Sequence, residues 1–534
     1  TFFAIAFAIV AGRIIDLSAF NDDRGTGTSA SVATGQSVRG DIVDRNGVVL
    51  ASSLAVASLY AEPRRIADPA LATEALMAVL PTLDHGQVFE KLSTGKSFVW
   101  LQRHLTPSQQ MAVNALGVPG LGFRTEQRRV YPHGALAAHV VGYAGIDNHG
   151  LGGIEQYFDA DLLGGGGQVS ALELSIDVRT QYALQEELAL ALEEFQAIGA
   201  AGLVLDARTG EIIAMVSLPN FDPNQIGTSL ADGRFNRASL GVYELGSTLK
   251  ILTIAMALEF GTATLESEFD ATEPLRVGRF TIRDDHPESR WLSVPEIFIH
   301  SSNIGAARMA MEVGADRQQE FLNRMGLMSR AGVQLPEVGT PIVPKPWRDT
   351  STMTVAFGHG IAVSPLQFAG AVAATINGGW AVPPTLIKSQ GPVDRQRVLS
   401  GETSEAIRRL LRLNVLEGTG TLAAAPGFLV GGKTGTAEKA RGGGYQSDAL
   451  VSSFVGAFPM NDPRYVVLAL LDEPQGNDST KGFATAGWTA APVVSRVISR
   501  IGPLLGVEPV DTISRTAQQA LFISLDGRTA GAAF

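Results

Sequence analysis

Three short clusters of polar residues, far apart along the chain, carry side chains that could do nucleophilic chemistry. The first is Ser247 and Lys250, at the start of the mostly apolar stretch 247–260. Residues three apart share one face of a helix, so this hydroxyl and this amine can touch. A serine hydroxyl needs a base within reach, and no histidine accompanies Ser247. Lys250 is therefore the candidate base, provided that burial and the positive end of the helix lower its pKa.

The other two clusters each have an ordinary structural explanation when taken alone. Ser301, Ser302 and Asn303 lie in "FIHSSNIGAA", where serine and asparagine could simply cap a helix. Lys433, Thr434, Gly435 and Thr436 lie in "VGGKTGTAEK", where a lysine could protect an exposed edge strand. The glycines of that phrase would also let another backbone approach the strand closely.

The order of the three clusters is more informative than any one of them. Ser-x-x-Lys also occurs at Ser93 and Lys96, where an ordinary polar turn is expected and Glu90 replaces the glycine of a phosphate loop. Ser-x-x-Lys, Ser-x-Asn and Lys-Thr-Gly in this order are the signature of penicillin-binding proteins and serine β-lactamases. The copy at Ser93 lies outside the segment that holds the other two clusters. Ser247 is therefore the predicted nucleophile.

Alternating apolar patterns predict the elements that hold these residues. Strand–turn–strand segments are expected in "IGAAGLVLDARTGEIIAMVSLPNFDPN" and in "SDALVSSFVGAFPMNDPRYVVLALLDEP", with helices at 247–260, 293–312 and 365–377 between them. Strands first and last with helices between predict an α/β domain, whose central antiparallel sheet joins both ends of the segment and is flanked by helices.

The chain is expected to hold several parts, because 534 residues exceed one simple core. An apolar run meets its first charge at Arg13 and is shorter than the roughly 20 residues that span a bilayer. We interpret it as the outer part of a membrane anchor; a signal-peptide core is the alternative. The expected parts are the anchor at 1–20, a non-catalytic α+β module at 21–165, a domain that holds the three polar clusters at 166–508 and a tail at 509–534.

Composition excludes several classes of function. A net charge of −11 leaves no basic surplus for non-specific nucleic-acid binding. The chain has no cysteine, which removes disulfides, thiol catalysis and thiolate metal sites. His286 and His359 lack metal-type spacing, so no metal and no cofactor is expected.

Longer phrases resemble one family throughout the chain. They include "RGDIVDRNGVVLA", "YPHGALAAHVVGYAG", "GLGGIEQYFDADLLG", "FGHGIAVSPLQ" and "SSFVGAFP". The chain resembles the class B penicillin-binding proteins to about residue 500, and "TGTAEK" and "NDPRYVVLALLDEP" are more similar to the septal than to the elongation enzymes. One departure is Leu245, where the family usually has proline before Gly-Ser.

The resemblance implies a serine D,D-transpeptidase that attacks the D-Ala–D-Ala end of a peptidoglycan stem peptide and is acylated by β-lactams. It makes 166–508 the transpeptidase domain and 21–165 a pedestal or dimerisation-type module. Ser301 would relay a proton, Asn303 would orient Lys250, and backbone amides of Ser247 and Thr436 would form an oxyanion hole. Lys433 would lower the pKa of Lys250 as a neighbouring cation. The expected catalytic residues are Ser247, Lys250, Ser301, Asn303 and Lys433. The expected substrate-binding residues are Ser302, Thr434, Gly435 and Thr436.

The resemblance also implies partners and a place in the cell. They are a polytopic SEDS-type lipid II polymerase and other division proteins, at the septum, with a single pass through the inner membrane and the bulk in the periplasm. Alternatives are an elongation-type transpeptidase, a β-lactamase or D,D-carboxypeptidase that deacylates with water, and a membrane-anchored β-lactam sensor or inert scaffold. The anchor and the large N-terminal module favour the transpeptidase over the hydrolases.

Overall fold

The computed structural model describes residues 38–164, 170–278, 280–441 and 444–512, together with 514, 521 and 523. The predicted anchor at 1–20 and most of the predicted tail lie outside these residues. In the part of the chain that is described, no helix has the length and apolar character needed to cross a bilayer. From Arg39 onward the described residues form one compact unit.

A five-stranded antiparallel sheet lies at the centre of the second half of the chain, in the order β16-β17-β18-β8-β9. Its strands are β8 (Gly199–Asp206), β9 (Ile212–Leu218), β16 (Gly431–Arg441), β17 (Gly444–Phe458) and β18 (Tyr465–Asp472). Both predicted strand–turn–strand segments are present as β8–β9 and β17–β18. Because β18 pairs with β8, the sheet joins the two ends of the segment, as the sequence predicted.

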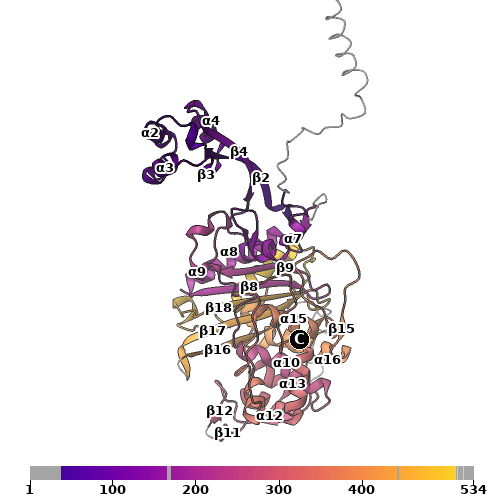
Figure 1. The fold of residues 1–534 in the computed structure, drawn as a ribbon. Coiled ribbons are helices and arrows are strands. Elements are labelled where there is room, and N and C mark those ends of the chain that lie inside the picture. The colour runs from indigo at the N-terminus through magenta and orange to yellow at the C-terminus, as the bar shows by residue number, and fades with distance from the viewer. Residues whose placement is uncertain are drawn as a thin grey trace, which may run out of the picture. The chain divides into compact units, whose positions relative to one another are not determined.

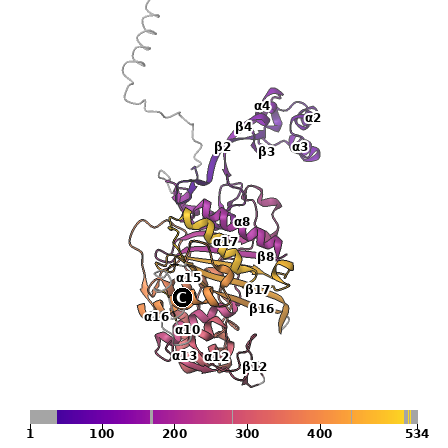
Figure 2. The ribbon, with the colours of Figure 1, turned by 180° about the vertical axis from the view of Figure 1, so that it is seen from behind.

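Helices cover both faces of this sheet (Figure 1). Helices α8 (Val178–Glu194) and α17 (Ala490–Leu504) pack together on one face, where Figure 2 shows them in front of the strands. On the other face α15 (Pro365–Ile376) packs on β8 and β18, with α10 (Lys250–Glu259) and α16 (Gly401–Glu417) behind it.

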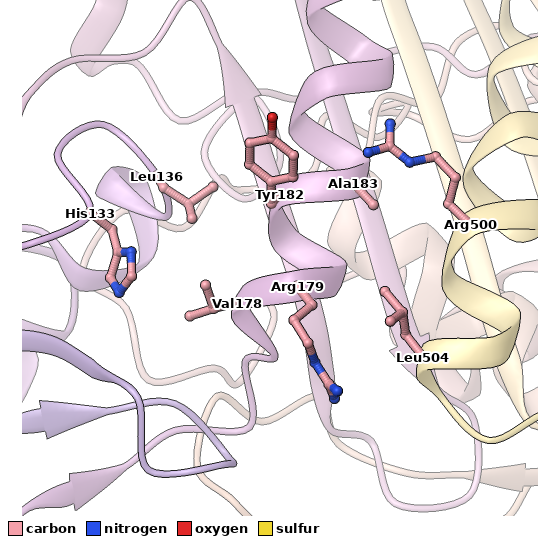
Figure 3. A pocket seen from close by; sticks show the side chains of 8 residues that line it. All are labelled: His133, Leu136, Val178, Arg179, Tyr182, Ala183, Arg500 and Leu504. Atoms are coloured by element: carbon pink, nitrogen blue, oxygen red, sulfur yellow. The ribbon is translucent and has the colours of Figure 1, made fainter.

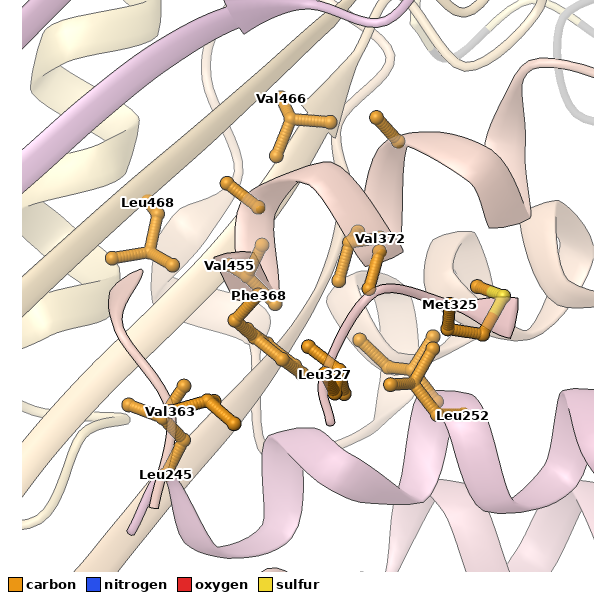
Figure 4. Packing of buried hydrophobic residues seen from close by; sticks show 14 of the residues in the cluster. Leu245, Leu252, Met325, Leu327, Val363, Phe368, Val372, Val455, Val466 and Leu468 are labelled. Atoms are coloured by element: carbon orange, nitrogen blue, oxygen red, sulfur yellow. The ribbon is translucent and has the colours of Figure 1, made fainter. Parts of the chain in front are cut away.

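Strand alternation supplies one apolar side chain to each face in turn. Leu203 and Leu468 belong to the core on the α15 side, and their neighbours Val204 and Val467 belong to the core under α8 and α17. Figure 4 shows the first of these cores, with strand side chains packed against Phe368 of α15. Burial of both faces explains why β8 is apolar or small at every position before Asp206.

Two of the three predicted helices are continuous and one is divided. The predicted helix 247–260 is a short 3-10 turn, η3 (Gly246–Leu249), that leads into α10, and the prediction 365–377 corresponds to α15. The stretch 293–312 forms α11 (Val294–Ile299) and α12 (Asn303–Val313) instead of one helix. The break occurs at Ser301, whose φ of 59° is left-handed and ends helical continuity.

The N-terminal module is α+β, as predicted. Long strand β2 (Val49–Ala61) pairs with β3 (Val99–Leu105), β4 (Leu121–Val130) and β1 (Ile42–Val43). Strand β1 also pairs in parallel with β7 (Leu172–Glu173), and a turn that contains Asn46 and Gly47 connects β1 to β2. Helices α2 (Pro69–Val79), α3 (His85–Leu92) and α4 (Pro107–Ala115) close a separate small core over this sheet. Ser93 is exposed at the end of α3, on an ordinary turn.

A buried ionic network ties this module together. Glu155 of α6 (Gly153–Tyr157) accepts from Arg39 Nε at 2.5 Å and from Arg129 Nε at 2.6 Å, and the side chains of Arg39 and Glu155 have no exposed surface. Arg39 Nη1 also donates to Asp159 at 2.6 Å.

Shorter elements complete the described chain: η1 (Pro63–Arg65), α5 (Ala138–Val141), β5 (Tyr143–Ala144), β6 (Gly150–Gly152), α7 (Asp159–Leu162), η2 (Pro223–Thr228), α9 (Ala231–Arg234), β10 (Glu268–Asp270), β11 (Leu275–Val277), β12 (Phe280–Ile282), β13 (Trp291–Ser293), α13 (Ala315–Arg324), α14 (Asp349–Val355), β14 (Trp380–Ala381), β15 (Gln396–Arg397), η4 (Thr421–Ala423) and η5 (Asp478–Thr480).

Candidate active site

A cleft of about 1540 Å³ brings the three polar clusters together. Its walls include the turn η3, the turn between α11 and α12, and strand β16. The predicted residues that line it are Ser247, Ser301, Asn303, Thr434 and Thr436. Lys250 and Lys433 lie beneath this surface and have no exposed area. Sequence segments almost two hundred residues apart thus supply one site.

The Lys250 amine is the centre of the hydrogen-bond network. Its Nζ lies 2.9 Å from Ser247 Oγ, 3.1 Å from Ser301 Oγ and 2.7 Å from Asn303 Oδ1. Burial lowers the pKa of Lys250 to about 7, against the opposing effect of the Asp284 and Asp285 carboxylates. A large fraction of the amine is therefore neutral near pH 7 and can accept the proton of Ser247.

The unusual backbone of Ser301 serves the same amine. Its left-handed φ of 59° accompanies a contact of 2.5 Å from Lys250 Nζ to the Ser301 carbonyl oxygen. The Ser301 hydroxyl lies 3.1 Å from Lys250 Nζ and 3.1 Å from Lys433 Nζ. Strained backbone is concentrated at functional sites, and here it leaves one hydroxyl between two amines. That hydroxyl can pass a proton from one side of the site to the other.

Lys433 is a second buried amine, and its nearest oxygens are three hydroxyls and the backbone carbonyl of Thr434. Besides Ser301, it contacts Thr419 Oγ1 and Thr434 Oγ1 at 3.4 Å each, and its Nζ lies 5.8 Å from the centre of the Phe298 ring. Burial, and secondarily the charge on Lys250, hold the pKa of Lys433 well below its ordinary value. Repulsion between these two amines belongs to the pair, because each disfavours the charged form of the other when both are protonated.

Two glycines allow the nucleophile turn to lie directly against β16. A Cβ atom on Gly435 would stand 2.1 Å from the Leu245 carbonyl oxygen, and one on Gly246 would stand 2.6 Å from the Thr436 carbonyl oxygen. Gly246 also has a φ of 54°, which favours glycine. The backbone before Ser247 and the backbone around Thr436 therefore run side by side at the floor of the cleft.

The family is decided by comparison with known proteins. Residues 200–497 match the model of the penicillin-binding protein transpeptidase domain, and residues 34–173 match that of the penicillin-binding protein dimerisation domain. The chain belongs to the penicillin-binding protein transpeptidase family. Its two matched regions cover the catalytic sheet and the N-terminal module described above.

Relatives of this penicillin-binding protein align over most of its length. It is 42% identical to the probable peptidoglycan D,D-transpeptidase FtsI of Caulobacter vibrioides, over 89% of this chain and 82% of the relative. It is 27% identical to the peptidoglycan D,D-transpeptidase FtsI of Escherichia coli, over 95% and 91%. A crystal structure of penicillin-binding protein 3 from Mycobacterium tuberculosis, complexed with aztreonam, superposes with a TM-score of 0.71 at 26% identity, over 89% and 98%.

Leu245, which stands where the family usually has proline, lies in the core of this penicillin-binding protein rather than in the cleft. Its side chain is buried and stands beside Val363 in Figure 4. Its carbonyl oxygen accepts from Thr248 Oγ1 at 2.9 Å, which stabilises the turn that carries Ser247. Apolar packing and this hydrogen bond therefore stabilise the turn, although it lacks a proline ring.

Asp284 is a residue of the site that sequence reasoning assigned no role. Its carboxylate accepts from Asn303 N at 2.6 Å, from Ile304 N at 3.0 Å and from Ser302 Oγ at 2.7 Å. Ser302 Oγ in turn accepts from Gly305 N at 3.0 Å, so the structure uses this buried hydroxyl as a cap of α12 and leaves it outside the lining of the cleft. Asp284 thereby fixes the start of α12. No spacing rule connects it to a residue 18 positions later.

A second hollow of this protein, of about 590 Å³, lies apart from these residues. Figure 3 shows it between α8 and α17, with Tyr182, Arg179 and Arg500 around it and His133 on a neighbouring segment. None of the predicted site residues lines it. Within the described residues, no three histidine or carboxylate side chains are placed to hold a metal ion. His359 is instead one of the residues that line the catalytic cleft.

Proposed function

We propose that this chain is the serine D,D-transpeptidase that cross-links peptidoglycan stem peptides during septal wall synthesis. The observation that carries the proposal is the contiguous network Ser247–Lys250–Ser301–Lys433, joined by contacts of 2.9, 3.1 and 3.1 Å at one cleft. A nucleophile, a base with its pKa near neutrality and a relay hydroxyl are the groups that acyl transfer requires.

The acylation half-reaction follows from these contacts. Neutral Lys250 takes the proton of Ser247 Oγ as the oxygen attacks the carbonyl carbon of the D-Ala–D-Ala bond. The backbone N–H groups of Ser247 and Thr436 stabilise the oxyanion. The proton then moves through Ser301 Oγ to the leaving nitrogen, the C–N bond breaks, and D-Ala departs. Asn303 keeps Lys250 oriented through its 2.7 Å contact.

The second half-reaction returns the enzyme. The amine of a neighbouring stem attacks the acyl carbon, Ser247 Oγ leaves and regains a proton, and a new amide bond forms. Lys433, Thr434 and Thr436 bind the terminal carboxylate of the donor. Burial lowers the pKa of Lys433 in the empty cleft. A bound carboxylate favours the protonated form of this amine, which then forms a charged hydrogen bond with it.

The septal role rests on sequence similarity to the two FtsI relatives, which also supports a membrane-anchored protein with its bulk in the periplasm. A SEDS-type lipid II polymerase and other division proteins are the partners that such a role requires, because the chain itself shows one catalytic site among its described residues. An elongation-type transpeptidase would use the same chemistry.

The first experiment measures intact mass after incubation with benzylpenicillin. Wild type is expected to gain one penicilloyl group, Ser247→Ala none, and the control Ser93→Ala one, because Ser93 is an exposed helix-end residue. Absence of the adduct from wild type, both alone and with a co-purified polymerase, would indicate an inert scaffold. A stable adduct without cross-linking in the presence of an acceptor would indicate a sensor.

A further inference from the structure

A carboxylate that the mechanism does not use lies on the wall of the catalytic cleft. Glu244 precedes Ser247 by three residues, and both line the cleft. Its Oε1 accepts from Gly360 N at 2.9 Å, and its Oε2 accepts from the Tyr445 hydroxyl at 3.1 Å. The three residues come from three separate segments of the chain, so the fold fixes the position of this carboxylate.

Both donors to Glu244 are neutral. In the described part of the chain, no Lys, Arg or His nitrogen forms an ion pair with it, whereas Lys439 on the same wall is paired with Asp472 at 2.7 Å. Burial raises the pKa of Glu244, and the two hydrogen bonds oppose this effect. Charged groups removed from water are normally paired, and a ligand cation with N–H donors would supply the charge-assisted bond.

The carboxylate faces an end of the cleft that differs in charge from the end at Lys433. Thr434, Thr436 and Glu438 lie on one face of β16 and all line the cleft. Four residues of strand span roughly 13 Å, so the wall runs about that far from the hydroxyl-rich end to Glu438. Tyr445 lies just beyond, on β17, and its pKa is raised first by burial and then by the charges of Glu244 and Glu438. One end of the cleft therefore holds a buried amine that a bound carboxylate would charge, and the other end holds the carboxylates of Glu244 and Glu438.

Stem peptides have a matching charge pattern under the proposed function, on which this inference rests. A donor ends in a carboxylate, and an acceptor attacks through an amine. Donor and acceptor are the same kind of peptide, so each carries a primary ammonium group in addition to its terminal carboxylate. The acidic end of the cleft can distinguish such a peptide from one whose amine is blocked.

We propose that Glu244, held by Gly360 and Tyr445, binds a primary ammonium group of a stem peptide. Glu244 is on this view a specificity-determining residue. A hydrogen bond between charged groups contributes about 1.5–3 kcal/mol, which corresponds to roughly ten-fold or more in affinity. His359 stands beside this position, with its ring centre 5.3 Å from that of Tyr445, and the burial that lowers its pKa keeps it from competing as a cation.

The test compares a stem pentapeptide that has a free amine with the same peptide acetylated on that amine. Each is used to slow acylation by benzylpenicillin, which has no ammonium group. Wild type is expected to bind the free amine roughly ten-fold more tightly, and Glu244→Gln to remove this preference. Glu438→Gln is the matched control and should keep it, because among the described residues no donor fixes Glu438 as Gly360 and Tyr445 fix Glu244.

The ammonium group could belong to the donor peptide or to the acceptor peptide. Binding of the free and the acetylated peptide to penicilloylated protein, measured by calorimetry, separates these two sources. A preference that disappears after acylation belongs to the donor, and one that persists belongs to the acceptor. If Glu244→Gln fails to fold in a thermal melt, Tyr445→Phe decides, since loss of its hydroxyl should weaken the preference several-fold.

Equal binding of the two peptides by wild type, or a preference that survives in Glu244→Gln, would overturn the inference. Failure of wild type to form the penicilloyl adduct would instead remove the proposed function. The two failures are therefore distinguishable in one set of samples.

Discussion

At the scale of single residues, Lys250 determines how acylation depends on pH. Its pKa is lowered to about 7 by burial, and only the neutral amine accepts a proton from Ser247. The rate of acylation by benzylpenicillin should therefore rise about ten-fold per pH unit below pH 7 and level off above about pH 8. Stopped-flow measurement between pH 5.5 and 9 would check this, and a flat profile would exclude Lys250 as the base. Lys250→Arg should be inactive throughout, because guanidinium stays protonated.

The charge of Asp284 also affects the pH profile of acylation. Its negative charge raises the pKa of Lys250, so Asp284→Asn should move the midpoint of the pH profile to lower pH. The same variant weakens the charged hydrogen bonds to the start of α12, at a cost of about 1–3 kcal/mol in the free energy of unfolding. A urea titration gives the second quantity. A midpoint that moves upward would show that the charge acts differently from this account.

The residues of the site divide into those that sequence could reveal and those that it could not. Ser247, Lys250, Ser301 and Lys433 stand in short motifs whose chemistry is readable from type and spacing, and the structure brings them within contact distance. Asp284 contacts Ser302, which follows it by 18 positions, through a folded loop. Its role depends on a distance in space that no local pattern records.

At the scale of elements, the contact between η3 and β16 is sensitive to a single methyl group. A Cβ on Gly435 would stand 2.1 Å from the Leu245 carbonyl oxygen, so Gly435→Ala must push the nucleophile turn away from the strand. Acylation is expected to fall by about a hundred-fold, in line with misplacement of reacting groups. Gly370→Ala is the control: its Cβ would meet nothing within 4 Å, and alanine should stabilise helix α15 by about 0.5–1 kcal/mol.

Elements were predictable where the apolar pattern was regular. The strands on each side of Arg208–Gly210 and Met460–Pro463, and the helices α10 and α15, follow from periodicity and turn residues. The division of 293–312 into α11 and α12 did not follow. Its cause is the left-handed φ of Ser301, which is stabilised by contacts from Lys250, and so by another segment of the chain.

At the scale of the whole molecule, the buried network around Glu155 should contribute strongly to stability. Glu155→Gln leaves Arg39 and Arg129 without the charge that both contact, which costs about 3–5 kcal/mol. Chemical denaturation would measure this loss. The control Asp147→Asn removes the charge from an ion pair between Asp147 and Arg103, in which the Asp147 side chain is 76% exposed. This variant should change the free energy of unfolding by less than about 1 kcal/mol. Equal effects of the two variants would contradict the argument.

The order of strands in the catalytic sheet has a consequence for synthesis of the chain. β18 lies in the middle of the sheet, between β17 and β8, yet it is the last of the five strands to be made. A nascent chain that ends just before Tyr465 therefore holds two separate hairpins, β8–β9 and β16–β17, whose β8 and β17 edges still lack their partner β18. Such edges invite pairing with other chains. The interval between translation of β9 and of β18 is thus the period in which this protein most needs protection by a chaperone.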